Sequence, residues 1–203
     1  MILKVLFEGV HEHDAPKNPK LRQHFTSIYS SVTLIKATEK GEKNIVIDTS
    51  NYHVKTKLIS ALKKEGLTPA KIDYVINTHA HFDHISNNYL FPCPKILYGS
   101  VWYADGTLDD YKTVEDIEIP CVHIIPAPGH KEEHISVVVK IKNSTYVIAG
   151  DAIRENAIRN KTVSAIEIES ARKILALADV IIPGHGRIIQ GKILEELRTV
   201  MGV

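Results

Sequence analysis

Cysteine is scarce in this sequence, because Cys93 and Cys121 are the only two among 203 residues. They lie far apart in the chain, and neither belongs to a Cys-x-x-Cys pair, the spacing typical of redox dithiols. We therefore expect two buried structural thiols in a reducing compartment, and no redox pair.

Long hydrophobic runs and an excess of charge of one sign are also missing. The first eight residues are too short for a signal-peptide hydrophobic region with a basic flank, and no later apolar run approaches the length that crosses a bilayer. The formal net charge is +1, and 44% of the residues are hydrophobic and 24% charged. This composition gives no sign of a dedicated nucleic-acid or membrane surface, so we expect a cytoplasmic protein.

Several catalytic signatures are absent as well. The sequence contains no Gly-x-Ser-x-Gly motif and no glycine-rich loop of the P-loop or dinucleotide type. A serine-hydrolase nucleophile elbow and a loop that cradles nucleotide phosphates are therefore not expected.

Short β-branched runs bounded by Gly, Pro, Asn or Asp do recur, and this pattern is typical of strands. Helical periodicity appears in three places, and Gly66 is placed to end the first helix. Strands in series with helices favour a layered α/β fold in which helices cover sheets, and no linker divides the chain, so we expect a single domain over residues 1–203. The expected strands span residues 3–7, 31–36, 45–48, 74–77, 95–98, 122–126, 135–141, 146–149 and 180–182, and the expected helices span 54–65, 168–177 and 193–201.

Four of these strands lead directly to a side chain that can bind a metal ion. Loops at strand ends on a rigid sheet normally build functional sites, so we expect the four side chains to converge. They are His79, His130, Asp151 and His185.

Residues 79–84 read His-Ala-His-Phe-Asp-His and add three further donors on one short turn. Imidazole nitrogens and carboxylate oxygens bind Zn, Fe or Mn, and a catalytic site typically offers about three protein ligands per ion with one position left for water. Seven donors therefore suit two divalent ions, for which we expect zinc, with iron or manganese as alternatives. The expected ligands are His79, His81 and His130 for the first ion, Asp83, His84 and His185 for the second, and Asp151 as a bridge between them.

In this order the motifs resemble the metal signature of the metallo-β-lactamase superfamily. They are His-x-His-x-Asp-His, Pro-Gly-His at 128–130, Gly-Asp at 150–151 and Pro-Gly-His-Gly at 183–186. The resemblance covers nearly the whole chain and implies an αββα sandwich with a binuclear site at one edge. Residues 88–94, 136–139 and 178–186 are most similar to the branch called metallo-β-lactamase domain-containing protein 1.

Two such ions can share a water and lower its pKa from ~15.7 to near 7, which supplies hydroxide for hydrolysis at neutral pH. The resemblance implies that Asp83 holds this hydroxide and passes its proton to the leaving group. His134, four residues beyond His130, is a reserve general acid or, alternatively, a structural residue behind the ligands.

The motifs do not select one substrate. A small-molecule thioester or lactone, or the phosphodiester of a short RNA, would suit the same ions, and cationic side chains near the ligands could bind an anionic carrier or a phosphate. Those cations are Lys131, Arg154, Arg159 and Arg187, for which a solvated surface position is the alternative.

Two functions of other classes are also compatible with the motifs. One is a persulfide dioxygenase-like enzyme with a single iron, and the other is a metal-stabilised binding module without turnover. His11 and His13 either line the pocket from an N-terminal hairpin or lie in an exposed loop. A homodimer is possible only in the sense that proteins of the expected fold commonly form dimers.

Overall fold

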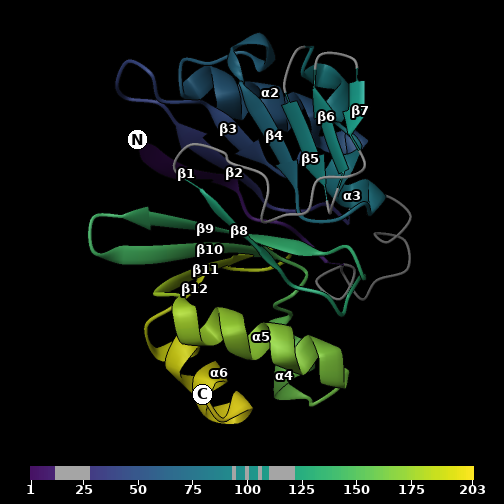
Figure 1. The fold of residues 1–203 in the computed structure, drawn as a ribbon, viewed down its shortest axis with the longest axis vertical. Helices are drawn as coiled ribbons and strands as arrows, with labels where there is room; N and C mark the ends of the chain where they lie inside the picture. Colours follow the sequence, from purple (N-terminus) through teal and green to yellow (C-terminus); the bar gives the residue numbers. More distant parts are fainter. Residues whose placement is uncertain (12–27, 93–94, 99–100, 105–106, 110–121) are drawn as a thin grey trace, which may run out of the picture.

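The computed structural model describes residues 1–11, 28–92, 95–98, 101–104, 107–109 and 122–203. Two mixed sheets face each other, with helix α2 on the outer side of one and helices α4, α5 and α6 on the outer side of the other (Figure 1). The predicted αββα sandwich is therefore confirmed. Cys93, Cys121 and His13, for which we made predictions, lie outside the described residues.

The first sheet has seven strands that lie side by side in chain order. Strands β3, β4 and β5 run parallel, and the other neighbours run antiparallel. The strands are β1 (Ile2–Phe7), β2 (Val32–Lys36), β3 (Ile45–Ile47), β4 (Tyr74–Asn77), β5 (Lys95–Tyr98), β6 (Val101–Ala104) and β7 (Thr107–Asp109).

The second sheet has five strands in the order β12, β11, β10, β9, β8. Only β10 and β11 run parallel, and helix α5 crosses between them. The strands are β8 (His123–Pro126), β9 (Ile135–Ile141), β10 (Ser144–Gly150), β11 (Val180–Pro183) and β12 (Ile189–Gln190).

The helices and short turns complete the element order. The α-helices are α2 (Lys55–Lys64), α3 (Phe82–Ile85), α4 (Glu155–Arg159), α5 (Ala165–Leu177) and α6 (Lys192–Met201), and the 3-10 turns are η2 (Tyr52–Val54), η3 (Pro69–Lys71) and η4 (Asn88–Leu90). No helix in the described part of the chain combines the length and the apolar character needed to cross a membrane.

Side chains of the first sheet alternate between two cores because successive residues of a strand point to opposite faces. Ile45 and Ile47 of β3 point between the sheets, whereas Val46 packs beneath α2. Leu58 and Leu62, one helical turn apart on α2, are fully buried against that outer face. Both faces of β3 are therefore covered, which holds the carboxyl end of this strand in a fixed position.

Helix α5 begins at Ala165, three residues before the predicted start, and a capping box explains the difference. The Ser164 hydroxyl accepts from the Glu167 backbone N–H at 3.3 Å, and Glu167 Oε2 accepts from the Ser164 backbone N–H at 2.7 Å. These two bonds satisfy backbone donors of the first turn and extend the helix beyond its apolar periodicity. Strands β6, β7 and β12 and helices α3 and α4 were not predicted, because none of these short segments carries a β-branched run or enough turns to show a helical period.

Candidate metal centre

The side chains of the candidate centre come from both sheets. His79 follows β4 of the first sheet, and His130, Asp151 and His185 follow strands β8, β10 and β11 of the second. Helix α3 begins directly after His81 and turns the next two donors toward a second cluster. The seven predicted ligands form two groups, and within each group one ligand atom of every residue lies within 4.8 Å of the others: His79, His81, His130 and Asp151 in the first, and Asp83, His84 and His185 in the second.

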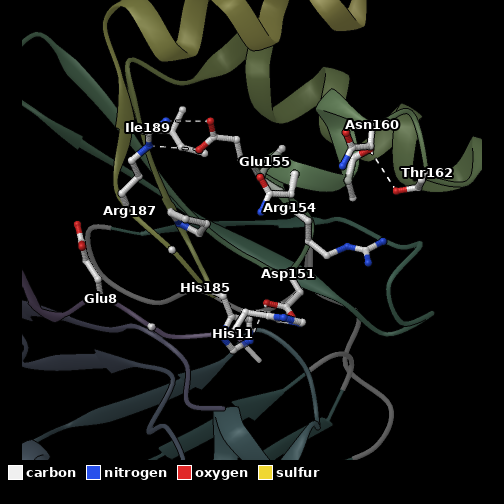
Figure 2. Close-up of a pocket in the computed structure, with 16 residues that line it drawn as sticks. Glu8, His11, Asp151, Arg154, Glu155, Asn160, Thr162, His185, Arg187 and Ile189 are labelled. Atoms are coloured by element: carbon white, nitrogen blue, oxygen red, sulfur yellow. Dashed lines mark hydrogen bonds and ion pairs between the residues drawn. The ribbon is translucent and has the colours of Figure 1, made fainter. Parts of the chain in front are cut away.

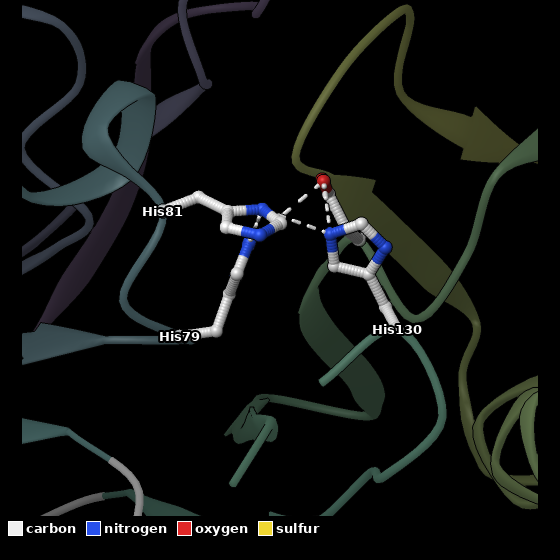
Figure 3. Close-up of side chains that lie close together, drawn as sticks. His79, His81 and His130 are labelled. Carbon is white, nitrogen blue, oxygen red and sulfur yellow. Dashed lines mark hydrogen bonds and ion pairs between the residues drawn. The ribbon is translucent and has the colours of Figure 1, made fainter. Parts of the chain in front are cut away.

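The first cluster brings three imidazole nitrogens together (Figure 3). His81 Nδ1 lies 3.0 Å from His79 Nε2 and 3.0 Å from His130 Nε2. Asp151 Oδ2 lies 3.3 Å from His130 Nε2 and 3.9 Å from His79 Nε2. Ligand atoms at zinc distances in a tetrahedral site stand about 3.3 Å apart, so these four atoms fit one tetrahedral ion.

The second cluster lies on the other side of Asp151. Asp83 Oδ2 is 3.1 Å from His185 Nε2 and 3.8 Å from His84 Nε2. Asp151 Oδ1 is 3.5 Å from His84 Nε2 and 3.6 Å from His185 Nε2. The two oxygens of Asp151 therefore face different clusters, which is the arrangement expected of a shared carboxylate.

Two buried atoms that face each other at this second cluster, 3.5 Å apart, have no hydrogen-bond partner among the described residues. They are His84 Nε2 and Asp151 Oδ1, and both residues are almost completely buried. Leaving buried polar atoms unpaired is costly and calls for an explanation. A divalent cation between them would satisfy both atoms, so the donor set fits a metal ion.

Burial and charge tune the ligands toward metal binding. Burial lowers the pKa of His79, His81 and His130, so these imidazoles are neutral at pH 7, the form that binds metals. Burial also lowers the pKa of His84, but the negative charges of Asp48 and Asp151 outweigh it and raise the pKa to about 10. The carboxylates around His84 therefore favour positive charge at this point, whether a proton or a metal ion.

For the carboxyl groups of Asp151 and Asp83, burial raises the pKa and neighbouring histidines lower it. Burial raises the pKa of Asp151, but the close contact with His84 and the charge of His84 outweigh it and hold the pKa well below its usual value. The pKa of Asp83 is lowered in the same way, against its burial, by the hydrogen bond from His185 and the charge of His84. Both side chains are ionised at neutral pH, as ligands of a cation must be.

Asp48, which orients one of the ligands, was not predicted from the sequence. Asp48 Oδ2 lies 2.8 Å from His84 Nδ1, and both oxygens of Asp48 accept hydrogen bonds from Thr78, at 2.8 Å from its N–H and 2.9 Å from its hydroxyl. These bonds direct His84 Nε2 to the cluster. Asp48 follows strand β3 as other donors follow their strands, and this shared position was the available signal.

His134 lies behind the ligands. It is only 1% exposed, and its ring stacks on His79 with the ring centres 4.9 Å apart. His134 Nε2 accepts a hydrogen bond from the Asp151 backbone N–H at 3.1 Å, and burial lowers the pKa of His134 to about 3. This geometry favours the structural alternative over the predicted general acid, because a buried acceptor is poorly placed to reach a substrate.

A cavity of about 780 Å³ opens beside the second cluster (Figure 2). Asp151 and His185 form one wall of this cavity, and α4 and the segment after β11 form others. His11 also lines it, with its ring edge-on to His185 at 5.3 Å between ring centres. Of the predicted cations, Arg154 and Arg187 line the cavity.

Comparisons with known proteins agree with this geometry. The family model described as the metallo-beta-lactamase superfamily matches residues 26–92. A Methanocaldococcus jannaschii protein named as a metallo-hydrolase is 33% identical over 153 residues, covering 71% of this chain and 72% of its own. Metallo-beta-lactamase domain-containing protein 1 of Xenopus laevis is 31% identical over 167 residues, covering 77% of this chain and 70% of its own.

Among solved structures, a Thermotoga maritima protein classed with the metallo-beta-lactamases shares the fold. The TM-score is 0.72 at 20% sequence identity, over 93% of this chain and 98% of that one. The two relatives show that the chain belongs to the metallo-β-lactamase superfamily and is related to metallo-β-lactamase domain-containing protein 1, and the solved structure shows the same fold.

Proposed function

We propose that this protein is a metal-dependent hydrolase that holds two divalent ions and cleaves an ester-type bond. The observation that carries the proposal is Asp151, whose Oδ1 and Oδ2 face two separate groups of donors. A mononuclear site would need only one of the groups, yet no expected ligand of the second is missing. The relatives named as metallo-hydrolases support the same class of reaction.

When bound, the ions would supply an activated water as nucleophile and would stabilise the negative charge that develops on the substrate. Asp83 is placed to manage the proton. Asp83 belongs to the second cluster, its side chain is 18% exposed, and its Oδ2 lies 3.1 Å from His185 Nε2. We assign to Asp83 Oδ2 the orientation of the water and the transfer of its proton to the leaving group.

The remaining residues position this machinery. Asp48 directs His84, and the His134 ring holds the backbone N–H of Asp151. The cavity beside Asp151 and His185 provides room for the part of the substrate next to the cleaved bond. Thioesters, lactones and the phosphodiester of a short RNA are the substrate classes for the test, and zinc is the first metal to load, followed by iron and manganese.

The test is a screen of the metal-loaded protein against a thioester, a lactone, a generic phosphodiester and single-stranded RNA. We expect turnover of at least one substrate, and a loss of roughly 10²- to 10⁴-fold in Asp83→Asn, the size of a general acid–base contribution. His84→Ala should also lose turnover together with one bound ion. Asp73→Asn is the matched control, because this carboxylate pairs with Lys43 on the surface of the first sheet.

Metal analysis distinguishes the alternatives. Two zinc or manganese ions per chain with hydrolysis support the proposal. One iron per chain with oxygen uptake on a persulfide would replace it with the dioxygenase, and inactivity in both assays would indicate a binding module. Equal hydrolysis by the wild type and Asp83→Asn would refute the role of Asp83.

A further inference from the structure

The cavity beside the second cluster contains charged side chains that bind no candidate metal ion. Its wall includes Arg154, Glu155 and Arg187, together with apolar surface from Ile153 and Ile189 (Figure 2). A cavity of about 780 Å³ is in the range that encloses small molecules. Which of the charges is available to a substrate depends on its present partners.

Arg187 is already paired. Its Nε and Nη2 atoms donate to the two oxygens of Glu155 at 3.3 Å and 3.0 Å, in the fork geometry that satisfies guanidinium and carboxylate together. Arg159, next to this pair, donates to Glu155 and to Glu196, both at 2.9 Å. Nε and Nη2 of both arginines are therefore occupied by carboxylates, so neither arginine offers that fork to a ligand.

Arg154 differs from both. Its Nη2 donates to Glu167, and within the described part of the chain its other guanidinium N–H groups have no partner. The side chain is 38% exposed, whereas that of Glu167 is only 10% exposed. Glu167 is itself held by the capping box at the start of α5. A rigid carboxylate therefore fixes Arg154 through one nitrogen and leaves its other guanidinium donors without a partner among the described residues.

The position of Arg154 relates this guanidinium to the candidate metal centre. Arg154 stands three residues after Asp151 and lines the same cavity. An ester bound at the clusters would thus place its non-reacting part near an arginine with open donors.

We propose that Arg154 binds an anionic group of the substrate, a carboxylate or a phosphate, so that this site takes esters that carry a negative charge away from the cleaved bond. That the substrate is an ester rests on the proposed function, but the binding of the anion does not depend on turnover. Arginine is suited to this task because its planar fork matches both anions and keeps its charge at every relevant pH. Glu167 pairs with the single positive charge of Arg154 through one nitrogen and leaves the other guanidinium donors for the anion. Its rigid hold also reduces the entropy that is lost when the anion binds.

Calorimetric titration of the zinc-loaded protein tests the binding step. The probes are glutarate, butyrate, which lacks the second carboxylate, and 4-phosphonobutyrate, which replaces it with a phosphonate. We expect at least one of the two dianions to bind roughly tenfold or more tightly than butyrate, as for hydrogen bonds to charged groups. The tighter of the two dianions then shows which anion the site prefers.

The variants attribute the preference to one residue. Arg154→Gln should bind dianions and butyrate with similar affinity, and Arg154→Lys should retain part of the preference because it keeps the charge without the fork. Arg187→Gln is the matched control from the same cavity and should retain the wild-type preference. The proposal would be overturned if the wild type showed no preference for dianions over butyrate, or if the preference survived in Arg154→Gln. If Arg154→Gln does not fold, an undiminished preference in Arg154→Lys would overturn it instead.

Turnover provides a second and separate readout. The ratio of kcat/KM for the mono-p-nitrophenyl ester of glutarate to that for p-nitrophenyl butyrate should fall roughly tenfold or more in Arg154→Gln, mainly through KM. If the wild type cleaves no ester, phosphodiester or RNA, the proposed hydrolase fails, and the titration alone still decides whether Arg154 binds an anion.

Discussion

Asp48 Oδ2 lies 2.8 Å from His84 Nδ1, and this contact turns the opposite nitrogen of the imidazole toward Asp151. Asp48 has a φ of 54°, a left-handed conformation that aspartate and asparagine tolerate better than most residues. The position combines a backbone that few side chains accept with a carboxylate that orients a ligand. A substitution of Asp48 therefore perturbs the second cluster without replacing a metal ligand.

We expect Asp48→Asn to weaken metal binding at the second cluster by about 10- to 100-fold, the usual effect of losing an orienting carboxylate. Asparagine keeps the backbone conformation but removes the charge that attracts the His84 ring. Competitive titration with a fluorescent zinc chelator would measure the change. Affinity at the first cluster should change less, and an equal loss at both clusters would contradict this account.

His134→Ala should destabilise the protein and disturb Asp151. The substitution leaves the Asp151 backbone N–H buried without its acceptor, at a cost of about 1–3 kcal/mol, and adds a cavity. Denaturant unfolding of the metal-free protein would measure the loss. His134→Gln supplies another acceptor and should recover part of it, so equal losses in the two variants would argue against the hydrogen bond as the cause.

Gly184→Ala should disrupt the bridge between the two clusters. A Cβ atom at Gly184 would lie 2.1 Å from Asp151 Oδ1 and 2.9 Å from His84 Cε1, far inside van der Waals contact. The carboxylate must therefore move, and we expect fewer than two ions per chain by elemental analysis.

The matched control for this glycine is Gly66→Ala. Gly66 ends α2 with a φ of +75°, so alanine there should cost about 1–2 kcal/mol of folding stability, but no atom of the candidate centre is near. Two bound ions in Gly66→Ala and fewer in Gly184→Ala would separate the metal effect from general destabilisation. The same ion count in both variants would contradict the steric argument.

Zinc should stabilise the folded protein in two steps. A ligand at 100 times its dissociation constant adds about 2.7 kcal/mol per site to the free energy of unfolding. We expect His185→Ala to retain the contribution of the first cluster and Asp151→Ala to lose most of both. His123→Ala, an exposed histidine on β8, is the control. Denaturant unfolding with and without zinc measures the gain, and an undiminished gain in Asp151→Ala would refute the shared carboxylate.

Much of the fold could be predicted because its signals are local. Strands β4, β5 and β9 have the predicted bounds, and α6 differs by one residue, since β-branched runs and helical periodicity show in consecutive residues. The division of the seven donors into two groups could also be predicted, because the turn before α3 separates His81 from Asp83. The place of Asp48 after strand β3 marked it as a candidate, but its role could not be predicted, since that role depends on a contact with a residue 36 positions away.

The amino-acid sequence by itself determined which donors are present, their order, and the strands that carry them. Only the tertiary structure decided that Asp151 presents one oxygen to each cluster and that His134 lies behind the ligands. It also decided that Arg154 donates to Glu167 through one nitrogen, while Arg187 is held by both oxygens of Glu155. The physical reason is that residue type and period are properties of neighbouring positions. The distances between segments are set by how two sheets pack through a shared core, and no local pattern records them.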